Sequence, residues 1–230
     1  MRLLKAEADG RVVLTECFPP NIPKYAILSH TWGPPDQEVT FQDISDGTAA
    51  SKRQTAADGL QYFWIDTCCI DKTSSAELTE AINSMFEWYR EAQHCYVYLS
   101  DVSTATDDGR QADSVLRLWD AQFRKSNWFK RGWTLQELLA PGSVKFFSVQ
   151  GDILGNRMSL KNAIHTVTNI EVSALDGRPL YDFPVHKRLQ WSSSRTTTKE
   201  EDAAYCLLGI FGVYLPLIYG EGKTSAMNRM

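Results

Sequence analysis

Two residues that can do chemistry, Trp133 and Glu137, lie four positions apart in the segment 131–139, whose pattern predicts a short helix stopped by a Pro-Gly pair. Residues four apart share one face of a helix, so we expect the indole and the carboxylate side by side. At about 100° per residue, Leu135 and Leu139 point roughly the opposite way and can bury against a core. The sequence therefore predicts a helix that leaves Glu137 free. A solvated glutamate without function fits the same spacing.

Polar side chains follow four apolar runs of strand length. The runs lie at 25–28, 62–65, 96–99 and 144–147, and the polar residues after them are Ser29 and His30, Asp66 and Thr67, Ser100 and Asp101, and Ser148. In an open α/β sheet, ligands bind outside the carboxyl ends of the parallel strands. We therefore expect Ser29, His30 and Asp66 on the rim of a site. Trp32, in the turn after Ser29, either faces a ligand or packs in the core, and for His30 a structural role competes equally with a binding role.

Helical patterns alternate with these runs, which predicts an α/β fold with a doubly wound parallel sheet. Three of the runs are apolar throughout, as in parallel strands covered on both faces. The helical patterns cover 48–58, 74–93 and the stretch that contains Leu116, Trp119 and Phe123. The second of them opens with a capping box of Ser74 and Glu77. Before the first run, residues 3–16 are typical of a β-hairpin that turns at Asp9 and Gly10.

Beyond residue 148 the pattern changes to short helices. They are expected at 159–167, 184–191 and 200–208, the last opened by a capping box of Thr198 and Glu201. No flexible linker separates the two parts. We therefore expect an α/β core with its hairpin at 1–148 and a helical extension at 149–230 packed on it. Another helical pattern begins shortly before Met230, which favours a fragment of a longer protein.

Composition narrows the class of protein. The chain has 230 residues, 43% hydrophobic and 23% charged, which is ample for one large domain with its own core. Its net charge is -4 and its basic residues are scattered, so binding to a nucleic-acid backbone is disfavoured. The five cysteines are odd in number and indicate buried, reduced thiols in a cytoplasmic protein. The sequence predicts neither a signal peptide nor a membrane span.

The segment GEGKT at 220–224 resembles the end of a phosphate-binding loop. The earlier glycine of such a loop would fall at Leu217, and no strand with a glycine run precedes it. We therefore do not expect a phosphate site here.

The cysteines allow two other sites. A zinc site of Cys68, Cys69, His94 and Cys95 lacks the two-residue spacing that aims two ligands at one metal, so we expect no metal. A cysteine hydrolase of Cys68 or Cys69 with His30 and Asp66 is geometrically conceivable, since all lie near strand ends. Nothing in the sequence lowers the pKa of either thiol, so core thiols are the favoured interpretation.

Three longer motifs follow one another along the chain. They are YAILSHTWG at 25–33, WIDTCCID at 64–71 and RGWTLQE at 131–137. Together they resemble the HET domain, the heterokaryon-incompatibility domain of fungal cell-death proteins. Shorter matches at 2–4, 95–102, 201–211 and 219–222 extend the resemblance over essentially the whole chain. It implies a cell-death effector of fungal innate immunity, followed in the full protein by nucleotide-oligomerisation and repeat domains.

The HET domain is in turn similar to the Toll/interleukin-receptor (TIR) fold, a flavodoxin-like parallel sheet, and some enzymes of that fold cleave NAD with one glutamate. In those enzymes a tryptophan commonly precedes the glutamate by four residues, as Trp133 precedes Glu137. The resemblance implies NAD as substrate, no cofactor, and Glu137 as the catalytic residue that stabilises positive charge on the ribose. The substrate-binding residues would be Ser29, His30, Trp32, Asp66 and Trp133.

Two functions remain open from the sequence. The first is assembly-dependent hydrolysis of NAD at the nicotinamide-ribose bond. In the second, the domain is a death-signalling adaptor without catalysis, and Trp133 and Glu137 are packing and interface residues. Both involve self-association into oligomers, so a fall in NAD on expression would distinguish them.

Overall fold

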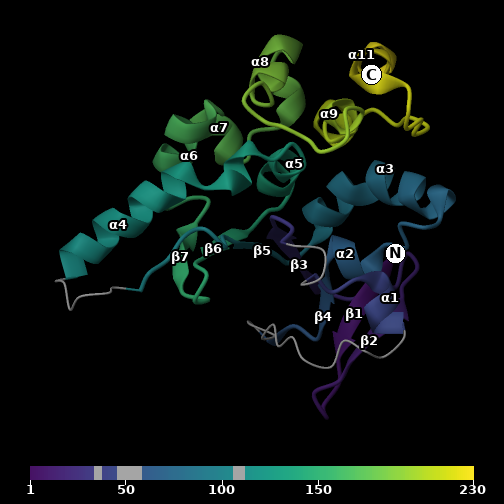
Figure 1. The fold of residues 1–230 in the computed structure, drawn as a ribbon, viewed down its shortest axis with the longest axis horizontal. Helices are drawn as coiled ribbons and strands as arrows, with labels where there is room; N and C mark the ends of the chain where they lie inside the picture. Colours follow the sequence, from purple (N-terminus) through teal and green to yellow (C-terminus); the bar gives the residue numbers. More distant parts are fainter. Residues whose placement is uncertain (34–37, 46–58, 106–111) are drawn as a thin grey trace.

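A seven-stranded sheet forms the centre of the described residues, in the order β2-β1-β4-β3-β5-β6-β7 (Figure 1). The computed structural model describes residues 1–33, 38–45, 59–105 and 112–230, so the helix predicted at 48–58 lies outside the described residues. The strands are β1 (Arg2–Ala6), β2 (Val12–Glu16), β3 (Tyr25–His30), β4 (Tyr62–Trp64), β5 (His94–Tyr98), β6 (Val144–Phe147) and β7 (Ile153–Asn156).

The four predicted apolar runs form the parallel middle of this sheet. β4 pairs with β3, β3 with β5, and β5 with β6, each in parallel. Numbered along the chain, these four strands take the order 2-1-3-4, which is the order in flavodoxin-like sheets. The predicted α/β fold is therefore confirmed. The order also reverses between β3 and β5, where such sheets bind their ligands.

Antiparallel strands extend the sheet at both edges. The predicted hairpin is confirmed, because β1 and β2 pair antiparallel around a turn in which Gly10 adopts a φ of 86°, a conformation that favours glycine. β1 then pairs antiparallel with β4. At the other edge β7 pairs antiparallel with β6. We expected only short helices after residue 148, so β7 is a strand that the sequence pattern did not indicate.

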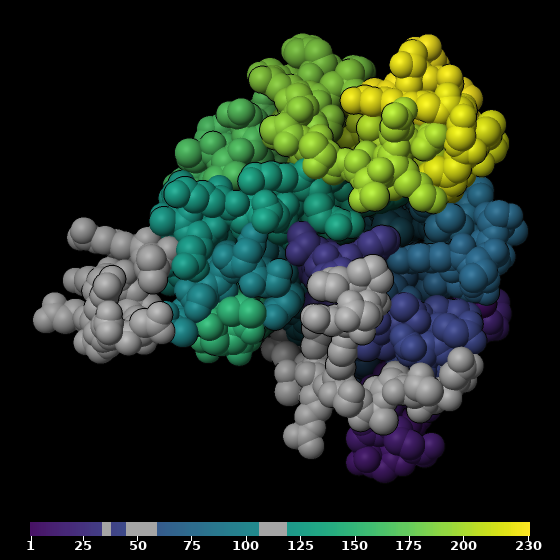
Figure 2. All heavy atoms as spheres, in the orientation of Figure 1, coloured from purple at the N-terminus to yellow at the C-terminus, as the bar shows by residue number. Residues whose placement is uncertain are grey.

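Helices surround the sheet. They are α1 (Phe41–Ser45), α2 (Asp66–Cys69), α3 (Ser75–Glu91), α4 (Ala112–Lys125), the 3-10 helix η2 (Asn127–Lys130), α5 (Thr134–Leu139), α6 (Lys161–Thr168), α7 (Val172–Leu175), the 3-10 helix η3 (Leu180–Asp182), α8 (Val185–Gln190), α9 (Asp202–Tyr205), α10 (Leu208–Phe211) and α11 (Gly222–Arg229). The C-terminal helices gather along one side of the molecule (Figure 1), and on the face in Figure 2 they pack directly against the part of the chain that carries α3, α4 and α5.

Local capping explains only some of the helix starts. Ser74 caps α3 as predicted, since its hydroxyl accepts the backbone N–H of Glu77 at 3.3 Å. The capping box predicted from Thr198 to Glu201 is wrong, because α9 begins at Asp202 and has no side-chain cap. The single helix expected at 200–208 is instead two short ones, α9 and α10.

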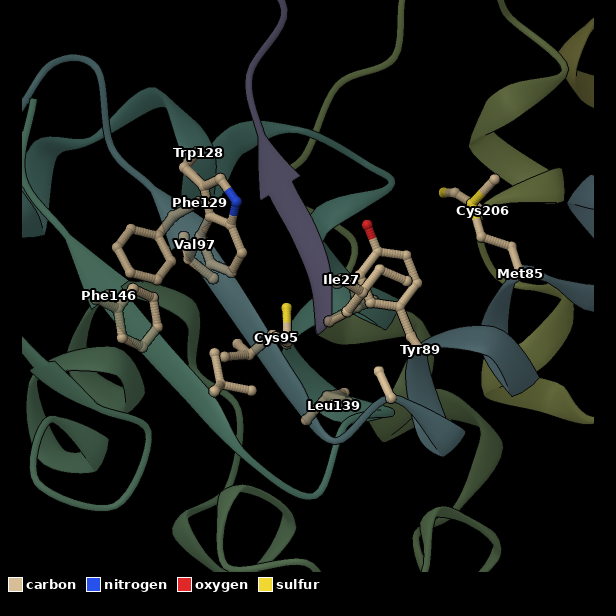
Figure 3. Packing of buried hydrophobic residues seen from close by; sticks show 14 of the residues in the cluster. Ile27, Met85, Tyr89, Cys95, Val97, Trp128, Phe129, Leu139, Phe146 and Cys206 are labelled. Carbon is tan, nitrogen blue, oxygen red and sulfur yellow. The ribbon is translucent and has the colours of Figure 1, made fainter. Parts of the chain in front are cut away.

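One hydrophobic core joins the sheet to its helices. Figure 3 shows Ile27, Cys95, Val97 and Phe146 of three adjacent strands packed with Tyr89 of α3, Trp128 of η2 and Leu139 of α5. Side chains of the C-terminal helices, among them Ile164 and Leu175, belong to the same core. All five cysteines are free and buried, which confirms the predicted thiols. Within the described ranges, no helix is long and apolar enough to span a membrane.

Candidate functional site

Glu137 lies in α5, and it is not the free carboxylate that the helical pattern predicted. All six residues of α5 are buried, and Glu137 is only 8% exposed. Leu135 and Leu139 are buried as expected. The other faces of the helix are covered too, because α3, β3 and η2 all contact α5. The prediction of an unburied glutamate is therefore wrong.

Ser29 and Trp128 hold the Glu137 carboxylate near the carboxyl end of β3. Ser29 is fully buried, and its hydroxyl donates a hydrogen bond to Glu137 Oε2. The same hydroxyl oxygen accepts the indole N–H of Trp128 at 2.8 Å. Figure 3 shows the Trp128 nitrogen turned toward β3. Ser29 thus makes its hydrogen bonds within the protein and orients the carboxylate.

The environment of Glu137 shifts its titration toward neutral pH. Burial raises the pKa of Glu137 to about 7, against the lowering effect of the Ser29 hydrogen bond. Among the nearby charges, Asp66 raises this pKa, whereas His30 and Arg131 lower it. A buried carboxyl group perturbed in this way, at the ligand-binding edge of a parallel sheet, is a candidate for function.

His30, the last residue of β3, is engaged by Glu38. Its Nε2 lies 3.2 Å from Glu38 Oε2, and the other oxygen of Glu38 accepts the backbone N–H of Gly33 at 2.6 Å. Burial disfavours the charged imidazole, but the Glu38 hydrogen bond and the charges of Asp66, Glu38 and Glu137 outweigh it and raise the pKa of His30. His30 is therefore held beside Glu137 by a carboxylate that favours the charged form of its imidazole.

Trp32 and Asp66 join the ends of two neighbouring strands. The Trp32 indole N–H donates to Asp66 Oδ2 at 3.0 Å, so the turn after β3 is bonded to the start of α2, just beyond β4. Trp32 is 47% exposed and does not pack in the core. The sequence left two interpretations open for Trp32, a residue that faces a ligand and a core residue. This geometry fits an indole that faces outward and not a core residue.

A pocket of about 380 Å³ opens beside Trp32, within the range of small-molecule sites. The residues that line it are Trp32, Gly33, Glu38, Thr40, Phe41, Gln42, Thr67, Ile70, Asp71, Lys72 and Thr73. Glu137 does not line this pocket. Asp66 connects the two places, because it bonds to Trp32 and its charge acts on Glu137.

Trp133 lies apart from this group. Its indole N–H donates to Asp202 Oδ2 at 3.2 Å, and its ring packs partly buried against the cluster that contains Ala204, Tyr205 and Leu208. Burial raises the pKa of Asp202, and the hydrogen bond from Trp133 opposes that shift. These contacts tie α5 to the C-terminal helices. A role for Trp133 in lining the site stays a prediction.

Arg195 is a buried cation against the start of α5. Its Nη1 donates to the Arg131 carbonyl at 2.8 Å and to Thr134 Oγ1 at 2.7 Å. Burial lowers the pKa of Arg195 to about 10, while the charge of Glu137 acts to raise it. Its Nε and Nη2 atoms are buried without a partner among the described residues. Arg195 therefore adds positive charge near Glu137 from the C-terminal part.

The remaining strand ends have structural roles. Asp101 accepts the hydroxyl of Ser126 at 2.7 Å and the backbone N–H of Asn127 at 2.8 Å, so it holds the start of η2. Ser148 is fully buried, and its hydroxyl oxygen accepts the N–H groups of the turn that follows it. Of the four strand ends, those of β3 and β4 thus contribute to the site.

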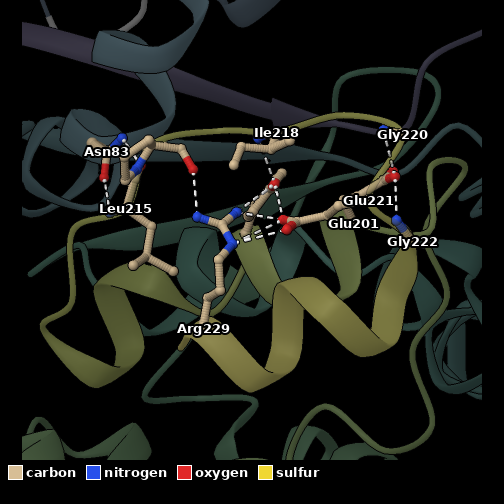
Figure 4. A network of polar contacts seen from close by, with 10 residues as sticks. Asn83, Glu201, Leu215, Ile218, Gly220, Glu221, Gly222 and Arg229 are labelled. Atoms are coloured by element: carbon tan, nitrogen blue, oxygen red, sulfur yellow. Dashed lines mark hydrogen bonds and ion pairs between the residues drawn. The ribbon is translucent and has the colours of Figure 1, made fainter.

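In the segment 220–224, a carboxylate of the protein occupies the place where a phosphate-binding loop would hold its ligand. The backbone N–H groups of Gly220 and Gly222, which a phosphate loop would offer to its ligand, donate to Glu201 Oε1 at 2.8 and 3.0 Å (Figure 4). Backbone hydrogen bonds from Glu201 itself, Gly222 and Gly220 lower the pKa of Glu201. This geometry is that of a structural turn.

The thiols do not form a nucleophilic site. Cys68 Sγ donates to the Val39 carbonyl at 3.2 Å, and burial raises the pKa of Cys68 to about 11. Burial raises the pKa of Cys69 as well. A protonated thiol is a poor nucleophile, so both residues act as core groups. In the part of the chain that the structure describes, no three His, Cys, Asp or Glu side chains are grouped as a metal site requires.

Sequence reasoning missed several residues of this site. Trp128, Glu38, Lys72 and Arg195 carry no motif that could have marked them. Each reaches the site from a loop or a short helix. Glu38, Lys72 and Arg195 lie far from Glu137 along the chain, whereas Trp128 lies nine residues before it. Only the topology of the sheet brings them together, so a single sequence held no signal for them.

Comparison with known proteins identifies the family of the chain. The model of the heterokaryon incompatibility protein (HET) family matches residues 25–117. The vegetative incompatibility protein HET-E-1 of Podospora anserina is 54% identical to the chain over 241 aligned positions, which cover 100% of this chain and 18% of that relative. No solved structure matches the chain. The motifs, the fold and this identity over the full length show that the chain belongs to the heterokaryon-incompatibility (HET) domain family.

Proposed function

We propose that this HET domain is a cell-death effector that hydrolyses NAD at the nicotinamide-ribose bond, with Glu137 as the catalytic carboxylate. The observation that carries the proposal is a buried glutamate, oriented by Ser29, near the carboxyl end of a central parallel strand. No other acid among the described residues combines burial with a raised pKa near 7 at this edge.

The chemistry needs little more than a placed anion. The bond between nicotinamide and ribose breaks, its electron pair leaves with nicotinamide, and the ribose gains positive charge that water then quenches with loss of a proton. An oriented carboxylate stabilises that charge, as in glycosidases. Trp128 keeps the Ser29 hydroxyl aimed at Glu137, so the carboxylate is preorganised before substrate arrives.

Self-assembly would be the step that gives substrate access to Glu137. At 8% exposure, the carboxylate is closed off in the single chain. Contacts between copies that shift α5 or the turn after β3 would open it. The name of the relative HET-E-1 refers to vegetative incompatibility, and depletion of NAD is a direct route from such a domain to death of the cell.

The test is the variant Glu137→Gln, which keeps size and packing but removes the charge. Loss of one preorganised electrostatic group typically lowers a rate by about a hundredfold or more. We expect cells that express the variant to keep their NAD and survive, while circular dichroism shows an intact fold. Exposed Glu80→Gln on α3 is the matched control and should kill as the parent does.

One result would replace this proposal. If Glu137→Gln still kills cells while NAD stays constant, the domain acts without catalysis, as an adaptor in homotypic assembly.

A further inference from the structure

Two cationic side chains lie over the exposed indole ring of Trp32. Lys72 Nζ lies 3.9 Å from the ring centroid and Arg131 Cζ lies 5.1 Å from it. The ring is 47% exposed and is held by its hydrogen bond to Asp66. Both cations lie over the ring, so a negatively charged ligand group that they bind would sit beside the indole.

Neither cation has a close acceptor of its own among the described residues. The nearest anion to Lys72 Nζ is Asp66 Oδ2 at 3.8 Å, which is beyond hydrogen-bond distance. The Arg131 guanidinium makes no hydrogen bond or ion pair within the described part of the chain. Burial lowers the pKa of Lys72, and the charge of Asp66 at 3.8 Å opposes that shift without cancelling it.

The carboxylates around these cations are already engaged elsewhere. Glu38 binds His30 and the backbone N–H of Gly33. Asp71 accepts the backbone N–H of Thr73 at 2.9 Å and its hydroxyl at 2.6 Å. The positive charge beside Trp32 is therefore available to a ligand.

The adjoining pocket has the size and lining for a nucleoside. Its volume is about 380 Å³, and Lys72 and Trp32 stand in its wall together with the hydroxyl-bearing Thr67 and Thr73. Lys72 is 39% exposed, so a ligand can reach it from solvent. Arg131 lies on the side toward α5, where its charge also acts on Glu137.

We infer that Lys72 and Arg131 bind the diphosphate of a dinucleotide beside Trp32, and that the pocket receives its adenosine half. This inference rests on the proposed function, because it extends the ligand of Glu137 into the pocket that Glu137 does not line. It gives the pocket a ligand class, adenosine diphosphate and its esters. It also makes Lys72 a residue that determines preference for a dinucleotide over a mononucleotide.

Binding can be measured without turnover. In the 230-residue chain with Glu137→Gln, calorimetry with ADP should give saturable binding, and adenosine alone should bind more weakly. Adding Lys72→Ala should weaken ADP binding by about tenfold, since a charge-assisted contact is lost, whereas Lys72→Arg should retain most of it. Lys223→Ala, an exposed lysine on α11, is the control and should bind as the parent does.

The inference and the proposed function can fail separately. With the active chain, Lys72→Ala should raise the KM for NAD and leave the KM for nicotinamide mononucleotide unchanged. The mononucleotide keeps the phosphate on the Arg131 side and lacks the adenosine-side phosphate that Lys72 would bind in the pocket wall. If ADP does not bind, or binds equally to Lys72→Ala, the inference is overturned. If ADP binds through Lys72 but the parent chain never cleaves NAD, the subsite stands and the hydrolase proposal falls.

Discussion

At the scale of single residues, Glu137 shows how an acid is kept in a protein interior. Burying a carboxylate without partners costs several kcal/mol, and the usual response is a raised pKa. Glu137 accepts a hydrogen bond from Ser29, and charges at longer range act on it, among them His30 and Arg131. Burial outweighs these partners and raises the pKa of Glu137 to about 7.

This environment predicts a dependence of stability on pH. The pKa of Glu137 is about 7 in the fold, against 4.5 for the free residue, so between these values the folded chain binds more protons than the unfolded one. The free energy of unfolding should therefore fall as pH rises from about 4.5 to about 7, by about 3 kcal/mol from this residue. Urea unfolding from pH 4.5 to 8 measures it.

Glu137→Gln lacks this titration and is the test variant. Its stability relative to the parent should increase as pH rises through this window, while that of exposed Glu80→Gln should stay constant. A difference that does not change with pH would mean that Glu137 titrates as an ordinary glutamate, contrary to the burial described above.

The sequence pointed to Glu137 as a candidate but did not predict its surroundings. From spacing alone we predicted that Trp133 and Glu137 share one helix face and that Glu137 is exposed. Such a pattern indicates only which face of a helix packs on the nearest core, not what covers its other faces. In the fold, α5 is enclosed by elements from both halves of the chain. Ser29 was expected to touch substrate, yet its hydroxyl is bonded to Glu137 and Trp128, an arrangement that depends on contacts about a hundred residues apart.

At the scale of elements, the C-terminal segment is fastened to the start of α5 along the backbone. Gly132 N donates to the Thr196 carbonyl at 2.9 Å, and Thr196 N donates to the Lys130 carbonyl at 2.7 Å. A Cβ on Gly132 would lie 2.5 Å from Thr197 Cγ2 and 3.1 Å from Cys206 Sγ. Glycine is thus needed here for close approach of two chain segments.

Gly132→Ala should separate these segments. Overpacking of this kind typically costs about 1–3 kcal/mol, so the variant should have a lower melting temperature in circular dichroism. Gly142→Ala is the matched control, because nothing lies within 4 Å of its added Cβ, and its melting temperature should be unchanged or slightly raised. Equal melting temperatures for the two variants would show that the contact at Gly132 is loose in solution.

Elements were predictable where the pattern was long and apolar. The four parallel strands follow from runs of branched and aromatic residues, and α3 from a long amphipathic stripe with its serine cap. β7 was missed because it is four residues long, contains Gly155 and has Ile153 70% exposed, so no alternation marks it. The box at Thr198 was wrong because Glu201 bonds to Gly220 and Gly222, a contact that no local rule anticipates.

At the scale of the whole molecule, the C-terminal part closes the site. Asp202 holds Trp133, Arg195 covers the start of α5, and helices of both halves share one core. The C-terminal helix is itself anchored, because the Arg229 guanidinium pairs with Glu221 and donates to the Pro216 carbonyl at 2.9 Å (Figure 4). The carboxylate is therefore enclosed by the same contacts that stabilise the fold.

This enclosure predicts that activity depends on assembly. If the open form is about 1% of the isolated chains, contacts that favour it can raise the apparent rate by up to about a hundredfold. We expect the chain fused to an inducible dimerising module to cleave little NAD as a monomer and much more when the inducer is added. Hydrogen exchange should at the same time show faster exchange of the α5 amides.

The dimerised Glu137→Gln fusion should show the same exchange without NAD cleavage, which separates opening from chemistry. An NAD cleavage rate per molecule that is unchanged by the inducer would mean that the single chain is already competent, and that substrate reaches Glu137 without assembly.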